Sequence, residues 1–275
     1  MVIILITYYL LLKHRMTLDD YILSHISPEG DYLYRLYRAT NVHLLYGRMA
    51  SGHLQGRLLK MIVQMTGARN ILEVGTFSGY SAICLAEGVR ENTKYETLNT
   101  KPETLNTNSE TLNTEHETRN TKSGSQCEVS GCTLPSHSCE GNPGRVVTFE
   151  INDELEPFTR PWLENSPVGD LIDFRIGNAV EEAPKLGMEF DLVFLDGDKR
   201  KYLEAYDMAM KVTRPGGYIL ADNTLWDGHV VEEPAPTDRQ TKGIMAFNDF
   251  IRNDKRVEVV ILPLRDGLTL IKKRL

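Results

Sequence analysis

Residues 190–199 read FDLVFLDGDK, and residues 216–223 read GGYILADN. Each run is apolar and ends in polar residues: Asp196, Asp198 and Lys199 in the first run, Asp222 and Asn223 in the second. Such runs are typical of buried parallel strands, and open α/β sheets bind ligands beyond the carboxyl ends of their strands. Two neighbouring strands that end in carboxylate and amide oxygens predict a cation site beside a ligand crevice.

Outward from these runs, strand-like and helix-like segments alternate. The strand-like segments cover residues 70–75, 145–152, 171–179, 190–198, 218–223, 257–264 and 268–275. Helical spacing of apolar residues fills 17–67, 153–164, 179–186, 201–212 and 239–253, with Ser51 as an expected helix N-cap. This alternation predicts an α/β fold with a doubly wound, mostly parallel sheet. Only three residues, Arg265 to Gly267, separate the last two strands, so we expect an antiparallel hairpin at one edge.

Residues 92–144 break the pattern. From Glu96 the unit ETLNTKP recurs every seven residues with small changes. A coiled coil needs two apolar positions in each heptad, whereas only Leu98, Leu105 and Leu112 recur here. We therefore expect 92–144 to be a disordered, low-complexity insertion. It divides a single domain into residues 16–91 and 145–275.

The N-terminal residues 1–15 are apolar for about a dozen positions, which is short of the ~20 needed to span a bilayer. Their positive charges follow the apolar run, whereas a signal peptide carries them before it. We expect an extension upstream of a functional protein that begins near Met16, with no membrane partner. A short membrane-associating helix is the alternative.

Charge and cysteine content narrow the function classes. The net charge of -7 argues against a general basic surface for nucleic acid. Four cysteines give little disulfide signal, so a reducing, cytoplasmic location is expected. A zinc site at Cys127, Cys132, Cys139 and His137 is a minor alternative, because the spacing lacks a CxxC pair.

A nucleotide site is indicated at the first strand. ILEVGTFSGYS places Glu73, Gly75 and Gly79 at a strand-to-helix turn, where glycine lets the backbone approach a ligand. The second strand ends in Glu150, and an acid at that point can bind both hydroxyls of a ribose. Once the insertion is subtracted, the spacing from Gly75 to Glu150 falls close to the ~20 residues expected of such a unit.

These motifs together resemble a known family. ILEVGTFSGYSA, VVTFEIN, FDLVFLDGDKRKY, PGGYILADNTLWDG and ILPLRDGLTL, in this order, are similar to the class I S-adenosylmethionine-dependent O-methyltransferases of the caffeoyl-CoA and catechol type. The match covers about residues 40–90 and 145–275, and FLDGDK paired with ADN marks the metal-dependent group. The resemblance implies a Rossmann-like, seven-stranded sheet with an antiparallel last strand, a homodimer, S-adenosylmethionine and a divalent cation.

The resemblance also implies roles for the residues that match the family's motifs. The cofactor-binding residues would be Met49, Ser51, Glu73, Gly75, Ser81, Glu150, Asn178, Ala179 and Asp196, with Gly177 near the adenine. The metal ligands would be Asp196, Asp222 and Asn223, and Lys199 would be the catalytic base.

The implied reaction is methyl transfer to a hydroxyl of a small aromatic acceptor with vicinal, catechol-like hydroxyls. A phenol-like hydroxyl has a pKa of ~10, so little of it is ionised at neutral pH. An oxygen-bound Mg²⁺, Ca²⁺ or Mn²⁺ would lower that pKa and orient the acceptor. Lys199 beside the cation could have a lowered pKa and accept the proton, or it could pair structurally with Asp198.

Other readings remain open. A hydroxylated nucleoside in tRNA is an alternative acceptor, which the acidic charge disfavours. A metal-dependent phosphatase could use Asp196-Gly-Asp198, although that chemistry usually lies on the first strand of its domain. An NAD-dependent oxidoreductase shares the fold but lacks the G-x-G-x-x-G pattern. A purely binding role is least favoured, because candidates for metal, ribose and base are all present.

Overall fold

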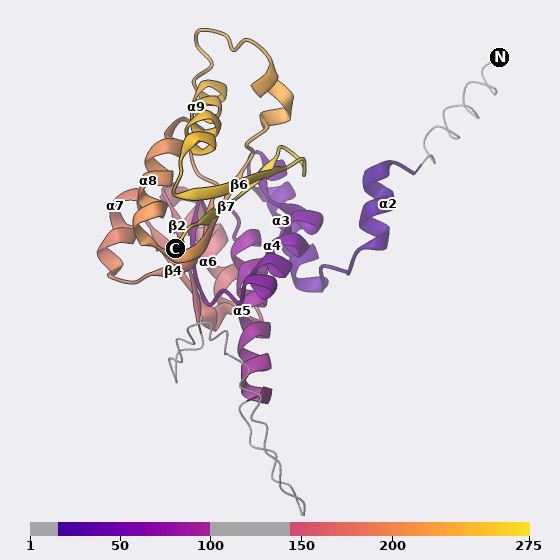
Figure 1. Ribbon diagram of the computed structural model, residues 1–275. Helices are drawn as coiled ribbons and strands as arrows, with labels where there is room; N and C mark the ends of the chain where they lie inside the picture. The colour runs from indigo at the N-terminus through magenta and orange to yellow at the C-terminus, as the bar shows by residue number, and fades with distance from the viewer. Residues whose placement is uncertain (1–15, 100–143) are drawn as a thin grey trace, which may run out of the picture.

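The computed structural model describes residues 16–99 and 144–275. Seven strands of these residues form one sheet in the order β3-β2-β1-β4-β5-β7-β6 (Figure 1). The strands are β1 (Asn70–Val74), β2 (Arg145–Glu150), β3 (Ile172–Ile176), β4 (Phe190–Leu195), β5 (Thr213–Asp222), β6 (Val257–Leu262) and β7 (Leu268–Lys273). Strands β1 to β5 pair in parallel, and β7 is antiparallel to β5 and β6. The predicted mostly parallel sheet with an antiparallel hairpin is confirmed.

Helices cover both faces of this sheet. They are α2 (Leu18–His25), α3 (Asp31–His43), α4 (Gly52–Thr66), α5 (Tyr80–Asn99), α6 (Glu156–Glu164), α7 (Ala179–Glu182), α8 (Tyr202–Val212) and α9 (Arg239–Asn253). Successive side chains of a strand point to opposite faces of the sheet, so alternate residues of β4 pack against different helices. Leu192 and Phe194 pack in the core with α3, α4, α5 and α6, whereas Val193 and Leu195 pack with α7, α8 and α9.

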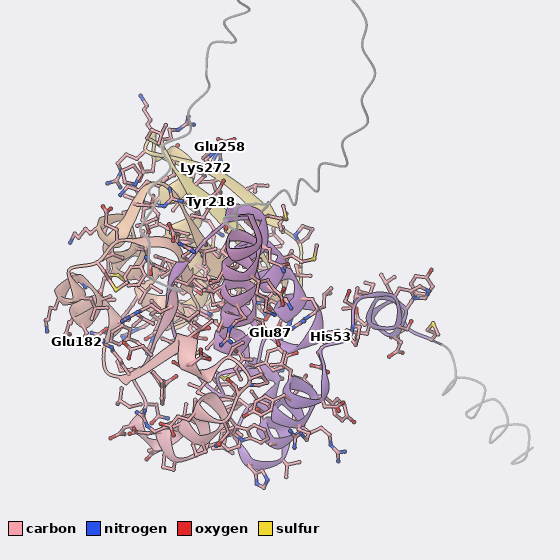
Figure 2. The ribbon with its side chains drawn as sticks, turned by 90° about the horizontal axis from the view of Figure 1, so that it is seen from below. His53, Glu87, Glu182, Tyr218, Glu258 and Lys272 are labelled. Atoms are coloured by element: carbon pink, nitrogen blue, oxygen red, sulfur yellow. The ribbon has the colours of Figure 1, made fainter. Side chains whose placement is uncertain are left out.

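The antiparallel end of the sheet carries a row of facing side chains. Tyr218 of β5 lies opposite Lys272 of β7, which lies opposite Glu258 of β6 (Figure 2). The ammonium group of Lys272 stands 5.9 Å from the centre of the Tyr218 ring. Cross-strand pairs of this kind help to fix the register. This register places the turn between β6 and β7 beside the carboxyl end of β5, because Asp222 lies opposite Leu268.

The strand order reverses between β1 and β4, which is where open α/β sheets bind ligands. At this point Gly75 has a φ of 98°, and a Cβ there would lie 2.5 Å from the carbonyl oxygen of Asp196. Only glycine therefore allows the two strand exits to lie so close. Asp196 N donates to Val74 O at 2.9 Å across the same junction.

Two local expectations were wrong. Helix α5 continues to Asn99, so residues 92–99 are helical instead of part of a structureless insertion. Asn92 supports this extension, because its Nδ2 donates to the carbonyl oxygens of Val63 in the last turn of α4 and of Ala68 just beyond it. Strand β5 begins at Thr213, five residues before the start expected at Tyr218. Ser51 occupies the expected N-cap position of α4, although its side chain makes no capping hydrogen bond.

Other expectations fall on residues that the structure does not describe. These are the extension 1–15, the segment 100–143 and the zinc alternative within it. In the described part of the chain, no helix has the length and apolarity needed to cross a membrane. Helix α2 begins with a capping box in which Thr17 and Asp20 exchange hydrogen bonds.

Asp191 offers a test of how the sheet is anchored. Its Oδ2 accepts from the backbone N–H groups of Arg69 and Asn70 at 2.9 Å, and its Oδ1 accepts from Arg214 Nε at 2.5 Å. Asp191→Ala leaves these strand-start donors unpaired, so we expect the free energy of unfolding to fall by about 1–3 kcal/mol. Urea unfolding measures it. The control is Asp173→Ala, which removes an exposed ion pair with Arg175 and should change stability by less than about 1 kcal/mol. Equal losses in the two variants would contradict the anchoring role.

Candidate active site

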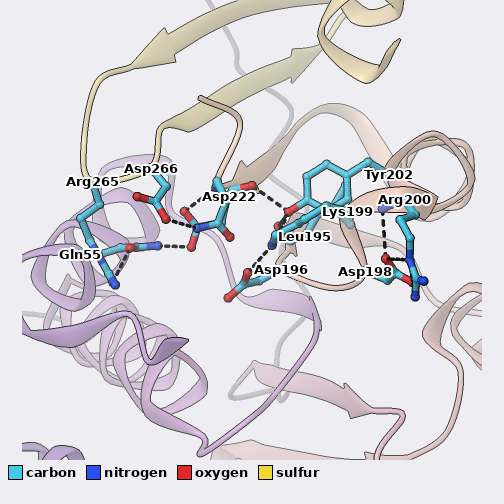
Figure 3. A network of polar contacts seen from close by, with 11 residues as sticks. Gln55, Leu195, Asp196, Asp198, Lys199, Arg200, Tyr202, Asp222, Arg265 and Asp266 are labelled. Carbon is cyan, nitrogen blue, oxygen red and sulfur yellow. Dashed lines mark hydrogen bonds and ion pairs between the residues drawn. The ribbon is translucent and has the colours of Figure 1, made fainter. Parts of the chain in front are cut away.

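A chain of hydrogen bonds joins the ends of β4 and β5. The Lys199 ammonium donates to Asp196 Oδ1 at 2.7 Å and to the Tyr202 hydroxyl at 2.8 Å. The Tyr202 hydroxyl in turn donates to the carbonyl oxygen of Asp222 at 2.7 Å (Figure 3). Lys199 is buried in the short 3-10 helix Lys199–Lys201 that follows β4. The sequence-predicted residues Asp196, Lys199 and Asp222 therefore belong to one connected cluster.

Lys199 is in its ammonium form. Burial opposes its charge, but the negative charge of Asp196, together with Tyr202 and Asp222, outweighs burial and raises its pKa above the ordinary lysine value. The lowering expected of this pKa applies to the cation-bound protein, and without a cation the pKa is shifted upward instead. The alternative pairing with Asp198 is wrong, because Asp198 forms its ion pair with Arg200 at 2.6 Å.

Asp222 is buried, with 6% of its surface exposed. Burial, and then the nearby charge of Asp196, raise its pKa to about 6. Its Oδ2 accepts from Gln55 Nε2 at 2.7 Å, and its Oδ1 accepts from the backbone N–H of Asn223 at 2.9 Å. A buried carboxylate whose ionisation is opposed by a neighbouring carboxylate favours a bound positive charge.

Asn223 completes the oxygen donors. Its backbone has a φ of 55°, and its Nδ2 donates to Asp266 Oδ2 at 3.3 Å. This contact fixes the side-chain amide so that Oδ1 remains as an acceptor. Among the described residues there is no group of three or more His, Cys, Asp or Glu that could hold a metal. The set of Asp196, Asp222 and Asn223 has two such residues and one amide, and its donors suit a hard cation such as Mg²⁺.

Glu73 lies at the end of β1 and is fully buried. Burial raises its pKa to about 8, and the hydroxyls of Ser81 and Thr148 partly offset that shift. Thr148 Oγ1 donates to Glu73 Oε2 at 2.5 Å, whereas Glu73 Oε1 accepts no hydrogen bond. The Ser78 hydroxyl nearby in sequence is also buried without a partner. Buried polar atoms without partners are unfavourable, so these groups fit a ligand that supplies the missing hydrogen bonds.

Glu150 ends β2 and is held rigidly. Its Oε2 accepts from Phe77 N at 2.8 Å, and its Oε1 accepts from Asn152 N at 2.9 Å. Phe77 has a φ of 49°, a left-handed conformation that turns its N–H toward this carboxylate. Each oxygen of Glu150 keeps a lone pair for a further donor such as a ribose hydroxyl.

The remaining sequence-predicted residues lie on the same edge. Gly177 follows β3 and donates its N–H to Glu150 O at 2.8 Å, Asn178 caps α7 through its side chain, and Ala179 is buried. Met49 and Ser51 lie where the chain enters α4, and Met49 is exposed whereas Ser51 is buried. The structure therefore brings the two predicted halves, nucleotide and cation, to one edge of the sheet.

Sequence reasoning missed three residues of the cluster: Gln55, Tyr202 and Arg265. A signal existed for Gln55, because it lies four residues before Leu59 on the buried face of α4, where a polar side chain needs a partner. No comparable signal marks Arg265 in the hairpin turn, and Tyr202 looks like any apolar residue of α8.

The chain is similar to known methyltransferases over most of its length. A family model described as O-methyltransferase matches residues 23–118 and 138–274. Tricin synthase 2 of Oryza sativa subsp. japonica is 27% identical over 270 residues, which cover 94% of this chain and 75% of the relative. Catechol O-methyltransferase of Niastella koreensis is 26% identical over 254 residues, 90% of each chain.

The fold is shared with solved structures. An SAH-bound methyltransferase from Podospora anserina matches with a TM-score of 0.69 at 20% identity, over 93% of both chains. The family model covers most of the chain, including both strand ends of the cation cluster and the Glu73 turn. The chain therefore belongs to the O-methyltransferase family, as a class I S-adenosylmethionine-dependent O-methyltransferase of the type that includes the caffeoyl-CoA and catechol enzymes.

Proposed function

We propose that this protein methylates one hydroxyl of a small aromatic acceptor with vicinal hydroxyls, with a divalent cation held by Asp196, Asp222 and Asn223. The observation that carries the proposal is the buried cluster at the exits of β4 and β5. The carboxylates of Asp196 and Asp222 and the side-chain amide of Asn223 lie at these strand exits, beside one ammonium group. The names of the caffeoyl-CoA and catechol relatives support an acceptor with adjacent oxygens on an aromatic ring.

The cofactor would lie across the ends of β1 and β2. Glu73 Oε1, which lacks a partner, would accept from the ammonium group at the methionine end, and Glu150 would accept from the ribose hydroxyls. Gly75 leaves room there for the backbone to approach the cofactor. Ser51 and Met49 would cover the cofactor from the start of α4.

Methyl transfer breaks the bond from sulfur to the methyl carbon and forms a bond from that carbon to the acceptor oxygen. The products are S-adenosylhomocysteine, a methyl ether and the proton that leaves the hydroxyl. A bound divalent cation would supply a lowered pKa for that hydroxyl and a fixed orientation. The chain's own contribution is to hold the acceptor oxygen in line with the methyl group, which is a large part of the rate in such displacements.

Lys199 is the proton acceptor in this proposal. Its ammonium is stabilised chiefly by Asp196 at 2.7 Å, so any ligand that engages the Asp196 carboxylate weakens that stabilisation and lowers the pKa of Lys199. The neutral amine can then accept the proton of the acceptor hydroxyl. Tyr202 keeps Nζ in place throughout, because its hydroxyl accepts from Lys199.

Asp222→Ala tests the cation role. We expect the variant to lose Mg²⁺-dependent methylation of catechol, because one of two carboxylate ligands is gone. The assay measures methyl transfer with Mg²⁺ and with a chelator, after calorimetry has shown that S-adenosylmethionine binds. Asp207→Ala, a change on the exposed side of α8, is the control and should remain Mg²⁺-dependent. If the wild-type protein turned over nearly as fast in chelator as with Mg²⁺, the cation role would be overturned. The methyltransferase assignment would remain intact.

Glu73→Gln tests the buried carboxyl. The folded pKa of about 8 lies above the ordinary value of 4.5, so proton binding stabilises the fold fully below pH 4.5, and this contribution is lost as pH rises through 8. The Glu73→Gln variant has no ionisable carboxyl group at this position, so it has no such loss of stability. We expect its stability relative to wild type to rise by roughly 3 kcal/mol between pH 5.5 and 8, measured by urea unfolding of the cofactor-free proteins. Its affinity for S-adenosylmethionine should fall, because an amide does not neutralise the ammonium. Parallel pH profiles would rule out a protonated Glu73.

A further inference from the structure

We propose that Gln55 and Arg265 are positioning residues that hold the carboxylate of Asp222 in the orientation needed to bind a divalent cation. The inference rests on the proposed function, because it assigns a role to residues around the proposed cation ligands. It adds the β6–β7 turn to the site, although this turn is remote in sequence from α4 and from β5.

Gln55 is the central link. Its side chain is 1% exposed, which is unusual for glutamine and implies that both ends of its amide are used. Nε2 donates to Asp222 Oδ2 at 2.7 Å, and Oε1 accepts from Arg265 Nη1 at 3.1 Å. Figure 3 shows the three side chains in a row, with Asp222 at the edge of the cluster that contains Lys199.

The direction of this relay follows from donor and acceptor chemistry alone. A guanidinium group can only donate hydrogen bonds, and an ionised carboxylate can only accept them. Gln55 lies between one of each, so its carbonyl oxygen must face Arg265 and its NH₂ must face Asp222. Arg265 therefore fixes which end of the amide Asp222 meets, and Asp222 receives a donor that favours its ionised form.

Arg265 is itself fixed by the segment that enters α4. Its Nη1 also donates to the carbonyl oxygens of Ala50, at 3.1 Å, and Ser51, and its Nη2 donates to Arg48 O at 3.1 Å. Its backbone has a φ of 49°, so the tight turn places a non-glycine residue in a sparsely populated conformation. The same guanidinium thus holds both the segment proposed to cover the cofactor and, through Gln55, the proposed ligand Asp222.

Asp266, the next residue of the turn, accepts a hydrogen bond from the proposed cation ligand Asn223. Asp266 Oδ2 accepts from Asn223 Nδ2 at 3.3 Å, and Asp266 O accepts from the backbone N–H groups of Leu225 at 2.7 Å and Trp226 at 3.0 Å. Thr224 N donates to Gly267 O at 3.1 Å. The turn is therefore bonded to residues 223–226, where the chain leaves β5, and these bonds support Arg265.

A carboxylate that loses such support can rotate away from its cation. Removal of partners that orient metal ligands typically costs 10- to 100-fold in metal affinity. Gln55→Met keeps the length of the side chain and its apolar stem but removes both hydrogen bonds. Gln64→Met is the matched control, because it is the same change in the same helix at a site away from the cluster.

The test measures Mn²⁺ affinity by electron paramagnetic resonance of the free ion and S-adenosylmethionine affinity by calorimetry, with the full chain. We expect Gln55→Met to bind Mn²⁺ about 10- to 100-fold more weakly than wild type, with unchanged cofactor affinity. Turnover should recover toward the wild-type kcat at saturating cation. Gln64→Met should match wild type in both titrations.

Equal Mn²⁺ affinity in Gln55→Met and wild type would overturn the inference while leaving the proposed function in place. If wild type bound no Mn²⁺, the cation part of the proposed function would fail and this inference with it. Should Gln55→Met fail to fold, Arg265→Lys replaces it, because lysine cannot reproduce the guanidinium fork. That variant should weaken both Mn²⁺ and cofactor binding, since Arg265 also holds Ala50 and Ser51; wild-type values for both would overturn the inference.

Discussion

The rest of the site depends on the contacts of the buried Lys199 ammonium group. It lies between the exits of β4 and β5, with Asp196 on one side and the Tyr202 hydroxyl on the other. A buried charge is tolerated only when it is paired and fully hydrogen-bonded. Asp222, the second carboxylate, is itself held by Gln55 and by the backbone of Asn223. The cluster therefore keeps two acidic side chains close together, although burial and the charge of Asp196 raise the pKa of Asp222, and it would leave oxygen atoms available for a cation.

The cofactor side of the edge is coupled to this cluster through the backbone. Gly75 follows β1 and touches the carbonyl of Asp196, so the turn proposed to carry the methionine end and the first proposed cation ligand are fixed relative to each other. Arg265 makes a second connection on the opposite side, because it holds both the Ser51 carbonyl and Gln55. Both connections are short. A methyl donor and an acceptor oxygen bound at this edge would be aligned by the packing of strand ends, which is the contribution that an in-line displacement needs most.

Strand ends could be predicted from sequence because a buried parallel strand is a continuous apolar run, and the polar residues that follow it are its exit. The parallel part of the fold and the placement of the two predicted halves of the site follow from that rule, whereas the antiparallel hairpin follows from the short separation of the last two strands. Charge pairing was less predictable. Asp198 and Asp196 both lie near Lys199 in sequence, and only the turn of the short helix after β4 decides that Asp196 is the partner. Without a cation the surrounding negative charge outweighs burial and raises the pKa of Lys199, whereas the lowering expected from the sequence depends on a bound cation. The contact between Arg265 and Gln55 spans 210 residues, and no local pattern encodes it.

The most direct test of the account is a crystal structure of the protein soaked with Mn²⁺ and S-adenosylhomocysteine, with the anomalous signal of manganese measured. The account predicts one strong anomalous peak in contact with Asp196, Asp222 and Asn223, with the cofactor product bound by Glu73 and Glu150. Bound S-adenosylhomocysteine with no manganese at these three residues, and with Lys199 still paired to Asp196, would contradict the central claim that the two strand ends form the cation half of a methyl-transfer site.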